Sequence, residues 1–160
     1  MKILILSDSH GVTKLMETVV AKHAAHVACV MFLGDYESDC KKIAGRFQNL
    51  TFHIVPGNCD FYSGLPRELT LEMGGKRFWL THGDRFGVKS GYGRIRSAAV
   101  DKGANICLFG HTHAPIVFEE NGILFLNPGS ISQPRGDLGK SYAVVDIVGG
   151  AVLAKLIEAK

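Results

Sequence analysis

Long hydrophobic runs are absent from this 160-residue chain. No stretch approaches the ~18 consecutive apolar residues that a membrane-spanning helix needs, so no such helix is expected. The N-terminus, MKILILSDSHG, is basic and then apolar, but the apolar part covers only residues 3–6 and Asp8 follows closely. That part is shorter than the ~7–15 residue core of a secretory signal. We therefore expect the first strand of a cytoplasmic protein.

The chain also has little net charge and no paired cysteine motif. Its formal charge of +3 is too small to demand a nucleic-acid partner. A modest basic group within residues 85–102 is more typical of a solvated helix face than of a polyanion site. The four cysteines contain no C-x-x-C pair, and Cys29 and Cys107 lie inside apolar runs. Buried free thiols in a reducing compartment are therefore expected.

No internal repeat, low-complexity tract or linker divides the chain. Hydrophobic residues make up 46% and charged residues 21% of the sequence, which is an ordinary balance for a globular protein. A chain of this length can bury a substantial core. We expect one domain that covers residues 1–160.

The apolar pattern predicts an α/β fold with two kinds of strand pairing. In the first half, short apolar runs alternate with helical periodicity, which favours parallel strands joined by helical crossovers. In the second half, glycine-containing turns at 74–75, 121–122 and 149–150 separate strand-like runs and indicate antiparallel hairpins. Two sheets packed together, with helices outside, would satisfy both halves. The predicted strands and helices cover residues 2–6, 13–25, 27–33, 38–47, 50–55, 68–73, 76–81, 91–103, 105–110, 115–127 and 141–158.

Polar residues of the kind that bind metals follow five of the apolar runs. These residues are Asp8 and His10, Asp35, Asn58, His82, and His111 and His113. Ligands bind at the carboxyl ends of strands in open α/β sheets, so these side chains are expected to meet at one edge. The two pairs have i, i+2 spacing, and in extended backbone both side chains of a pair would point the same way.

Each of these residues has a structural interpretation when it is taken alone. An aspartate after a strand usually caps a turn, and a single histidine is usually a satisfied structural residue. The remaining histidines, His23, His26 and His53, lie on or near a predicted helix or inside a strand, and we interpret them as structural. The set of two Asp, one Asn and four His is too large for one tetrahedral zinc. It suits two ions that share a carboxylate, with Mn, Fe, Co, Ni or Zn favoured over Ca or Mg.

Five short motifs in this order resemble the calcineurin-like metallophosphoesterases, in particular their small single-domain phosphodiesterase subgroup. The motifs are DSH at 8–10, GD at 34–35, GNCD at 57–60, TH at 81–82 and GHTH at 110–113. NPGS at 127–130 and PRG at 134–136 also resemble this subgroup. The resemblance implies a four-layer αββα sandwich, with two mixed β-sheets flanked by helices and a two-metal site at one edge. It assigns Asp8, His10, Asp35 and His113 to one metal, and Asp35, Asn58, His82 and His111 to the other, with Asp35 shared.

The function that this resemblance implies is metal-dependent hydrolysis of a small or nucleotide-like phosphodiester. A hydroxide bridging two divalent transition-metal ions, with manganese favoured, would attack phosphorus in line. The residues expected to act in catalysis are Asp35, Asn58, Cys59 and His111. The partner is then a small-molecule substrate, and 160 residues leave no room for the extra domains of the DNA-processing relatives. A homo-oligomer stays open.

Two positions depart from the wider superfamily, and two other functions stay open. Cys59 stands where many relatives have histidine, and it either assists the reaction or only fits the turn. Relatives often have histidine where Asp84 stands. For Ser130 and Arg135 a turn-forming role is favoured over contact with a substrate phosphate. The alternatives are phosphomonoester hydrolysis and a non-enzymatic protein-binding scaffold, as in a eukaryotic retromer subunit that shares the fold.

Overall fold

A computed structural model describes residues 1–160 as two five-stranded β-sheets packed face to face. The first sheet has the strand order β10-β9-β1-β2-β3. Strands β1, β2 and β3 are parallel, whereas β9 runs antiparallel to β1 and β10 antiparallel to β9. Its strands cover Lys2–Leu6 (β1), Cys29–Phe32 (β2), Thr51–Ile54 (β3), Ser141–Val148 (β9) and Ala151–Glu158 (β10).

The second sheet is also mixed, with the strand order β4-β5-β6-β8-β7. Strands β5, β6 and β8 are parallel, and the hairpin partners β4 and β7 are antiparallel edge strands. Its strands cover Glu68–Met73 (β4), Lys76–Thr81 (β5), Ile106–Leu108 (β6), Ile116–Glu120 (β7) and Ile123–Asn127 (β8).

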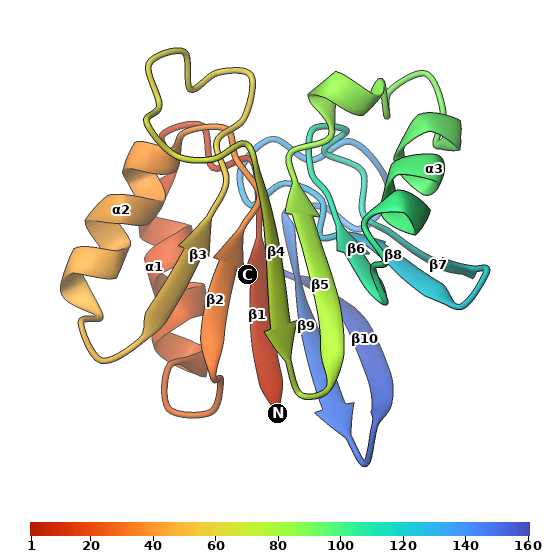
Figure 1. The fold of residues 1–160 in the computed structure, drawn as a ribbon. Coiled ribbons are helices and arrows are strands. Elements are labelled where there is room, and N and C mark those ends of the chain that lie inside the picture. Colours follow the sequence, from red (N-terminus) through yellow and green to blue (C-terminus); the bar gives the residue numbers. More distant parts are fainter.

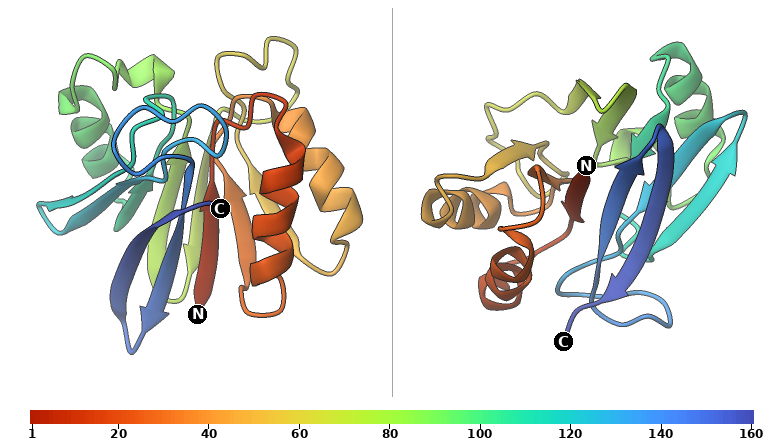
Figure 2. Two further views of the ribbon diagram at one scale, coloured as in Figure 1. Left: turned by 180° about the vertical axis from the view of Figure 1, so that it is seen from behind. Right: turned by 90° about the horizontal axis from the view of Figure 1, so that it is seen from below.

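Helices cover the outer face of each sheet. Helices α1 (Thr13–His23) and α2 (Glu37–Arg46) pack outside the first sheet, and α3 (Gly93–Asp101) packs outside the second (Figures 1 and 2). A short 3-10 helix, η1 (Asp84–Phe86), follows β5. The predicted sandwich of two mixed sheets flanked by helices is therefore confirmed. None of these helices has the length and apolar character that would let it cross a membrane.

The sequence KILIL shows why the central strands of this sandwich are apolar on both faces. Ile3 and Ile5 lie in the core between the two sheets, together with Phe78 and Leu80 of β5. Leu4 and Leu6 point the other way, into the core beneath α1 and α2. Because successive side chains of a strand point to opposite faces, a strand buried on both faces is a continuous apolar run rather than an alternating one.

The parallel strands place their carboxyl ends at one edge of the sandwich, the upper edge in Figure 1. The loops that follow β1, β2, β3, β5 and β6 meet there. The loop between β3 and β4 rises on one side of this edge, and the segment from η1 to α3 rises on the other (Figure 1). The strand order thus brings segments together that lie more than 100 residues apart in the chain.

Candidate metal centre

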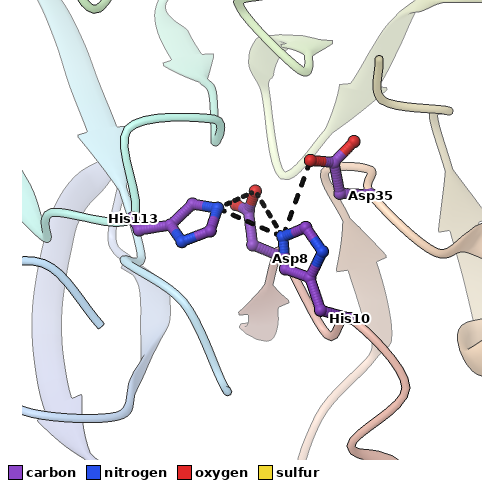
Figure 3. A group of neighbouring side chains, drawn as sticks. All are labelled: Asp8, His10, Asp35 and His113. Carbon is purple, nitrogen blue, oxygen red and sulfur yellow. Dashed lines mark hydrogen bonds and ion pairs between the residues drawn. The ribbon is translucent and has the colours of Figure 1, made fainter. Parts of the chain in front are cut away.

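The loops at this edge bring together the seven residues that the sequence analysis singled out. Asp8, His10, Asp35 and His113 form one group of neighbouring ligand atoms (Figure 3). Asp35, His82 and His111 form a second group, and in each group the ligand atoms lie within 4.8 Å of one another. Asn58 joins the second group, because its Oδ1 lies 3.2 Å from Nε2 of His82. Asp35 belongs to both groups.

The backbone at this edge is left-handed at most of these residues. Among the non-glycine residues with positive φ are Asp8, His10, Asp35, His111 and His113, with φ between 42° and 68°. The predicted extended backbone for the two i, i+2 pairs is therefore wrong, although the side chains of each pair do converge. A non-glycine residue in the left-handed region costs of order 1–3 kcal/mol of folding free energy. The surrounding structure must therefore hold these turns in place.

Asp8 is held in its turn by hydrogen bonds from distant segments. Its carbonyl oxygen accepts hydrogen bonds from Oγ of Ser130 at 2.7 Å and Oγ of Ser132 at 2.9 Å, and its N–H donates to the carbonyl of Gly34. Its Oδ2 accepts from Ser7 and from the N–H of His111. These bonds explain how the left-handed backbone at Asp8 is maintained. They also leave Asp8 Oδ1 buried and without a hydrogen-bond partner.

Two backbone carbonyls fix the orientation and tautomer of two histidines. Nδ1 of His82 lies 2.6 Å from the carbonyl of Leu33, and Nδ1 of His113 lies 2.7 Å from the carbonyl of Gln133. A carbonyl can only accept, so each Nδ1 carries the hydrogen, and in a neutral ring Nε2 presents a lone pair. These Nε2 atoms point into the two groups of ligand atoms. This is the arrangement in which histidines bind metals.

Potential metal-ligand atoms face one another at short range in both groups. Nε2 of His113 lies 3.1 Å from the unpartnered Asp8 Oδ1 and 3.2 Å from Nε2 of His10. Nε2 of His82 lies 3.2 Å from Nδ1 of His111 and 3.5 Å from Asp35 Oδ1. Lone pairs that face each other are stabilised only by a proton or a cation between them. The donor set therefore fits divalent transition metals.

The pKa values of His82, His111 and Asp35 are shifted by burial and by the charges that these residues place on one another. Burial works against a charged His82, but its hydrogen bond to Asp35 and the charges of Asp8 and Asp35 raise its pKa above the ordinary value. Burial and the neighbouring His82 lower the pKa of His111 to about 4. Burial opposes the charge of Asp35 as well, yet His82 and the Cys59 N–H lower its pKa below the usual range. Of the two facing imidazoles, His82 therefore takes the proton when no metal is bound.

The two positions that depart from the superfamily pattern also lie near the centre. Cys59 donates its N–H to Asp35 Oδ1 at 2.8 Å, so its backbone helps to orient that carboxylate. Partial burial and the charge of Asp35 raise the pKa of the Cys59 thiol to about 11. Asp84 begins η1, and its charge acts on the ring of His111.

Ser130, Arg135 and the three histidines interpreted as structural do not belong to either group of ligand atoms. Ser130 is buried and its hydroxyl donates to the Asp8 carbonyl, which fits the favoured turn-forming role, whereas Arg135 is exposed and its backbone N–H donates to the His113 carbonyl. His23, His26 and His53 lie outside both groups of ligand atoms.

Two supporting residues were missed from sequence, and one of them is Asp39. Its Oδ2 accepts from Ser9 Oγ and from the Gly11 N–H, each at 2.8 Å, and so fixes the loop after β1. Asn127 fixes the loop after β6 in a similar way, since its Nδ2 donates to the Gly110 carbonyl at 2.7 Å. Asp39 carries no sequence signal, because it lies inside an ordinary predicted helix. Asn127 begins the NPGS motif, but the motif alone does not show that this side chain fixes the loop after β6.

Removing the hydroxyls that hold Asp8 is expected to weaken metal binding. In the double variant Ser130→Ala, Ser132→Ala the Asp8 carbonyl loses two buried donors, and loss of such supporting bonds typically lowers metal affinity by ~10–100-fold. Titration of metal-free protein with Mn²⁺ measures the change. Ser97→Ala is the matched control, because that hydroxyl bonds only within its own exposed helix. Equal affinity in the double variant and the control would contradict this prediction.

Comparison with known proteins identifies relatives over nearly the whole chain. A family model described as the calcineurin-like phosphoesterase superfamily domain matches residues 1–150. The probable metallophosphoesterase YsnB of Bacillus subtilis is 32% identical over 99% of this chain and 91% of its own length. The phosphodiesterase YfcE of Escherichia coli K12 is 28% identical over 91% of this chain and 88% of its own.

The same likeness is seen among solved structures. The crystal structure of a conserved protein from Streptococcus pneumoniae TIGR4, described as a predicted phosphoesterase, superposes with a TM-score of 0.86. It is 35% identical in sequence, and the match covers 98% of this chain and 88% of that one. The agreement extends to the whole sandwich and not only to the loops that carry the motifs.

Proposed function

Because the chain belongs to the calcineurin-like phosphoesterase superfamily, we propose that it is a metal-dependent phosphodiesterase that acts on a small or nucleotide-like phosphodiester. One observation carries this proposal: in each group of ligand atoms a carbonyl-fixed imidazole turns its Nε2 atom toward other ligand atoms, and in the first group it faces an unpartnered carboxylate oxygen, so that a proton or a cation is needed between them. In this proposal residues 1–160 act as one domain. The three buried free cysteines support a reducing, cytoplasmic location.

The two groups of ligand atoms would each hold one divalent ion. Asp8, His10, Asp35 and His113 would bind the first, and Asp35, Asn58, His82 and His111 the second. Bound ions of this kind supply a hydroxide at neutral pH and offset the negative charge of the phosphoryl oxygens. Mixed imidazole and oxygen ligands suit manganese, iron, cobalt, nickel or zinc, and the proposal takes manganese as the first of these candidates.

The exposure of the ligands indicates from which side the substrate approaches. Asp8, His82 and His113 are buried, whereas Asn58 is exposed and His10, Cys59 and His111 are partly exposed. The phosphodiester would therefore meet the centre on the side of these four residues.

The Cys59 thiol and the Asp35 carboxylate have different tasks in this proposal. The Cys59 thiol is partly exposed on the side of the substrate and would act as a weak hydrogen-bond donor to a leaving-group oxygen. Asp35 stays ionised, and its orientation is fixed by the Cys59 N–H.

Metal removal and restoration tests the proposal directly. Protein stripped with a chelator is expected to lose all measurable activity on a chromogenic phosphodiester. Addition of Mn²⁺, Ni²⁺, Zn²⁺ or Mg²⁺ one at a time should restore it, with about two ions per chain in the active form. The matching monoester, assayed beside it, is expected to react more slowly. A faster monoester would favour the phosphomonoesterase alternative.

The same preparation separates the enzyme from a protein-binding scaffold. Circular dichroism of the stripped protein reports whether the fold persists, so a loss of activity can be assigned to the metal. Asn58→Ala should leave the fold intact and lower both activity and the metal content of the second group. A folded protein that takes up no metal and hydrolyses neither ester would contradict the proposal and favour the scaffold.

A further inference from the structure

Three exposed aromatic side chains lie on loops that also carry residues of the candidate metal centre. Tyr36 is 42% exposed, Phe61 79% and Tyr62 fully exposed, whereas every other aromatic residue of the chain is buried or partly buried. All three lie on the two loops that follow β2 and β3, which also carry Asp35 and Asn58. We call Tyr36, Phe61 and Tyr62 the aromatic rim. Single exposed apolar residues are ordinary, but a group of them at a polar site indicates binding.

Hydrogen bonds tie the two loops of the aromatic rim together. The N–H of Glu37 donates to Asp60 Oδ1 at 2.9 Å, and Oγ of Ser63 donates to the Glu37 carboxylate. The other carboxylate oxygen of Asp60 accepts from the Gly57 N–H at 2.8 Å. Phe61 and Tyr62 lie between Asp60 and Ser63, so they are anchored on both sides to the residue that follows Tyr36. Figure 1 shows this loop rising above the start of α2.

The ring of Tyr36 stands directly against the first group of ligand atoms. Its centroid lies 5.2 Å from that of the His10 ring, with an angle of 60° between the two planes. Tyr36 has a left-handed backbone with φ of 71°, as has its neighbour Asp35. This turn places the Asp35 carboxylate and the Tyr36 ring, from adjacent positions in the chain, near the His10 ring. An ester group bound at the metal centre would therefore lie beside an exposed aromatic face.

We propose that the aromatic rim binds an aromatic group of the substrate, a nucleobase or another aryl group esterified to the phosphate. This inference rests on the proposed function and deepens it by naming the substrate class. Aromatic side chains stack on planar rings whatever substituents the rings carry. A stacked base typically contributes about tenfold or more to affinity. The chain then selects nucleoside and aryl phosphodiesters over alkyl ones, and Tyr36 is the main determinant of that selectivity.

Binding of two phosphonates to the metal-loaded protein tests the aromatic rim without any turnover. Phenylphosphonate and methylphosphonate offer the same charged group and differ only in the aromatic ring. Calorimetric titration is expected to give about tenfold tighter binding of the phenyl compound to the unaltered protein. In Tyr36→Ala this preference should fall to less than about twofold. In the double variant Phe61→Ala, Tyr62→Ala it should fall by a smaller factor, and binding of methylphosphonate should stay unchanged in both. Tyr36→Phe should keep the preference, because the ring remains.

A remote control and two further measurements define what would overturn the inference. Leu153→Ala removes an equally exposed apolar side chain from β10, near the β9–β10 turn at the opposite end of the sandwich (Figure 1), and should keep the preference. Metal content must be equal in all variants. An unchanged preference in both rim variants overturns the inference, as does dissociation of a dimer in these variants without any change in preference. If the protein binds phenylphosphonate more tightly than methylphosphonate but hydrolyses no ester, the proposed function is wrong and the aromatic rim is still a binding site for aryl groups.

Discussion

Replacing Asp35 by asparagine is expected to lower kcat/KM for a phosphodiester at least about a thousandfold, which corresponds to ~4 kcal/mol of transition-state stabilisation. Asp35 is the only residue shared by the two groups of ligand atoms. Its Oδ2 lies 3.7 Å from Nε2 of His10, and its Oδ1 lies 3.5 Å from Nε2 of His82. Asparagine keeps the shape and one acceptor oxygen but removes the negative charge between the two sites. Both ions should therefore bind more weakly.

Metal content and kinetics measured on the same preparation check this prediction. Asp35→Asn should retain fewer ions per chain after gel filtration, and excess Mn²⁺ should not restore the rate. Circular dichroism should be unchanged, because the asparagine can still accept the Cys59 N–H. Asp146→Asn is the matched control, since Asp146 pairs only with the N-terminal amine, away from this edge. Activity within about threefold of the unaltered protein in Asp35→Asn would exclude the shared-carboxylate assignment.

The position of the site could be predicted from the sequence because it follows from strand direction. Parallel strands joined by helices must end at a common edge, and the residues after KILIL, VMFL and FHIV include Asp8, Asp35 and Asn58. Buried strands and glycine turns are local sequence signals, so the sandwich of two sheets could also be predicted. The structure places Asp8, Asp35 and Asn58 together for this reason. His82, His111 and His113 join them because β5 and β6 are also parallel, which the hairpin turns of the second half did not predict.

The geometry of the site could not be predicted because distant segments determine it. The left-handed backbone at Asp8 depends on the hydroxyls of Ser130 and Ser132, more than 120 residues away. The order β6-β8-β7, which brings β8 and the segment after it beside the loop of His113, has no local signal. The aromatic rim was also hidden, because a sequence does not show that Phe61 and Tyr62 are exposed when most aromatic residues form the core.

The Gly57→Ala substitution is expected to damage both the fold and the site, although it adds a single methyl group. The loops after β2 and β3 are packed backbone against backbone at this point. A Cβ on Gly57 would overlap the backbone nitrogen and the Oδ1 atom of Asp35, and a Cβ on Gly34 would lie 2.5 Å from the Gly57 nitrogen. The overlapped atoms belong to a backbone and a fixed carboxylate, so they cannot yield as the end of a flexible side chain can. Overpacking of this kind costs ~1–3 kcal/mol of folding free energy.

The loss of activity in Gly57→Ala should exceed what the loss of stability explains, because relief of the overlap moves Asp35 and Asn58 apart. We expect kcat/KM to fall ~100-fold with saturating metal, in line with the cost of small misplacements in active sites. Denaturant unfolding of the metal-free protein measures the stability change separately. Gly64→Ala is the control, since its Cβ would meet no atom within 4 Å and the change should stay within ~0.5 kcal/mol. If both variants behave alike, close packing of these two loops does not position the metal ligands, and Asp35 must be held by the Cys59 N–H and the ions themselves.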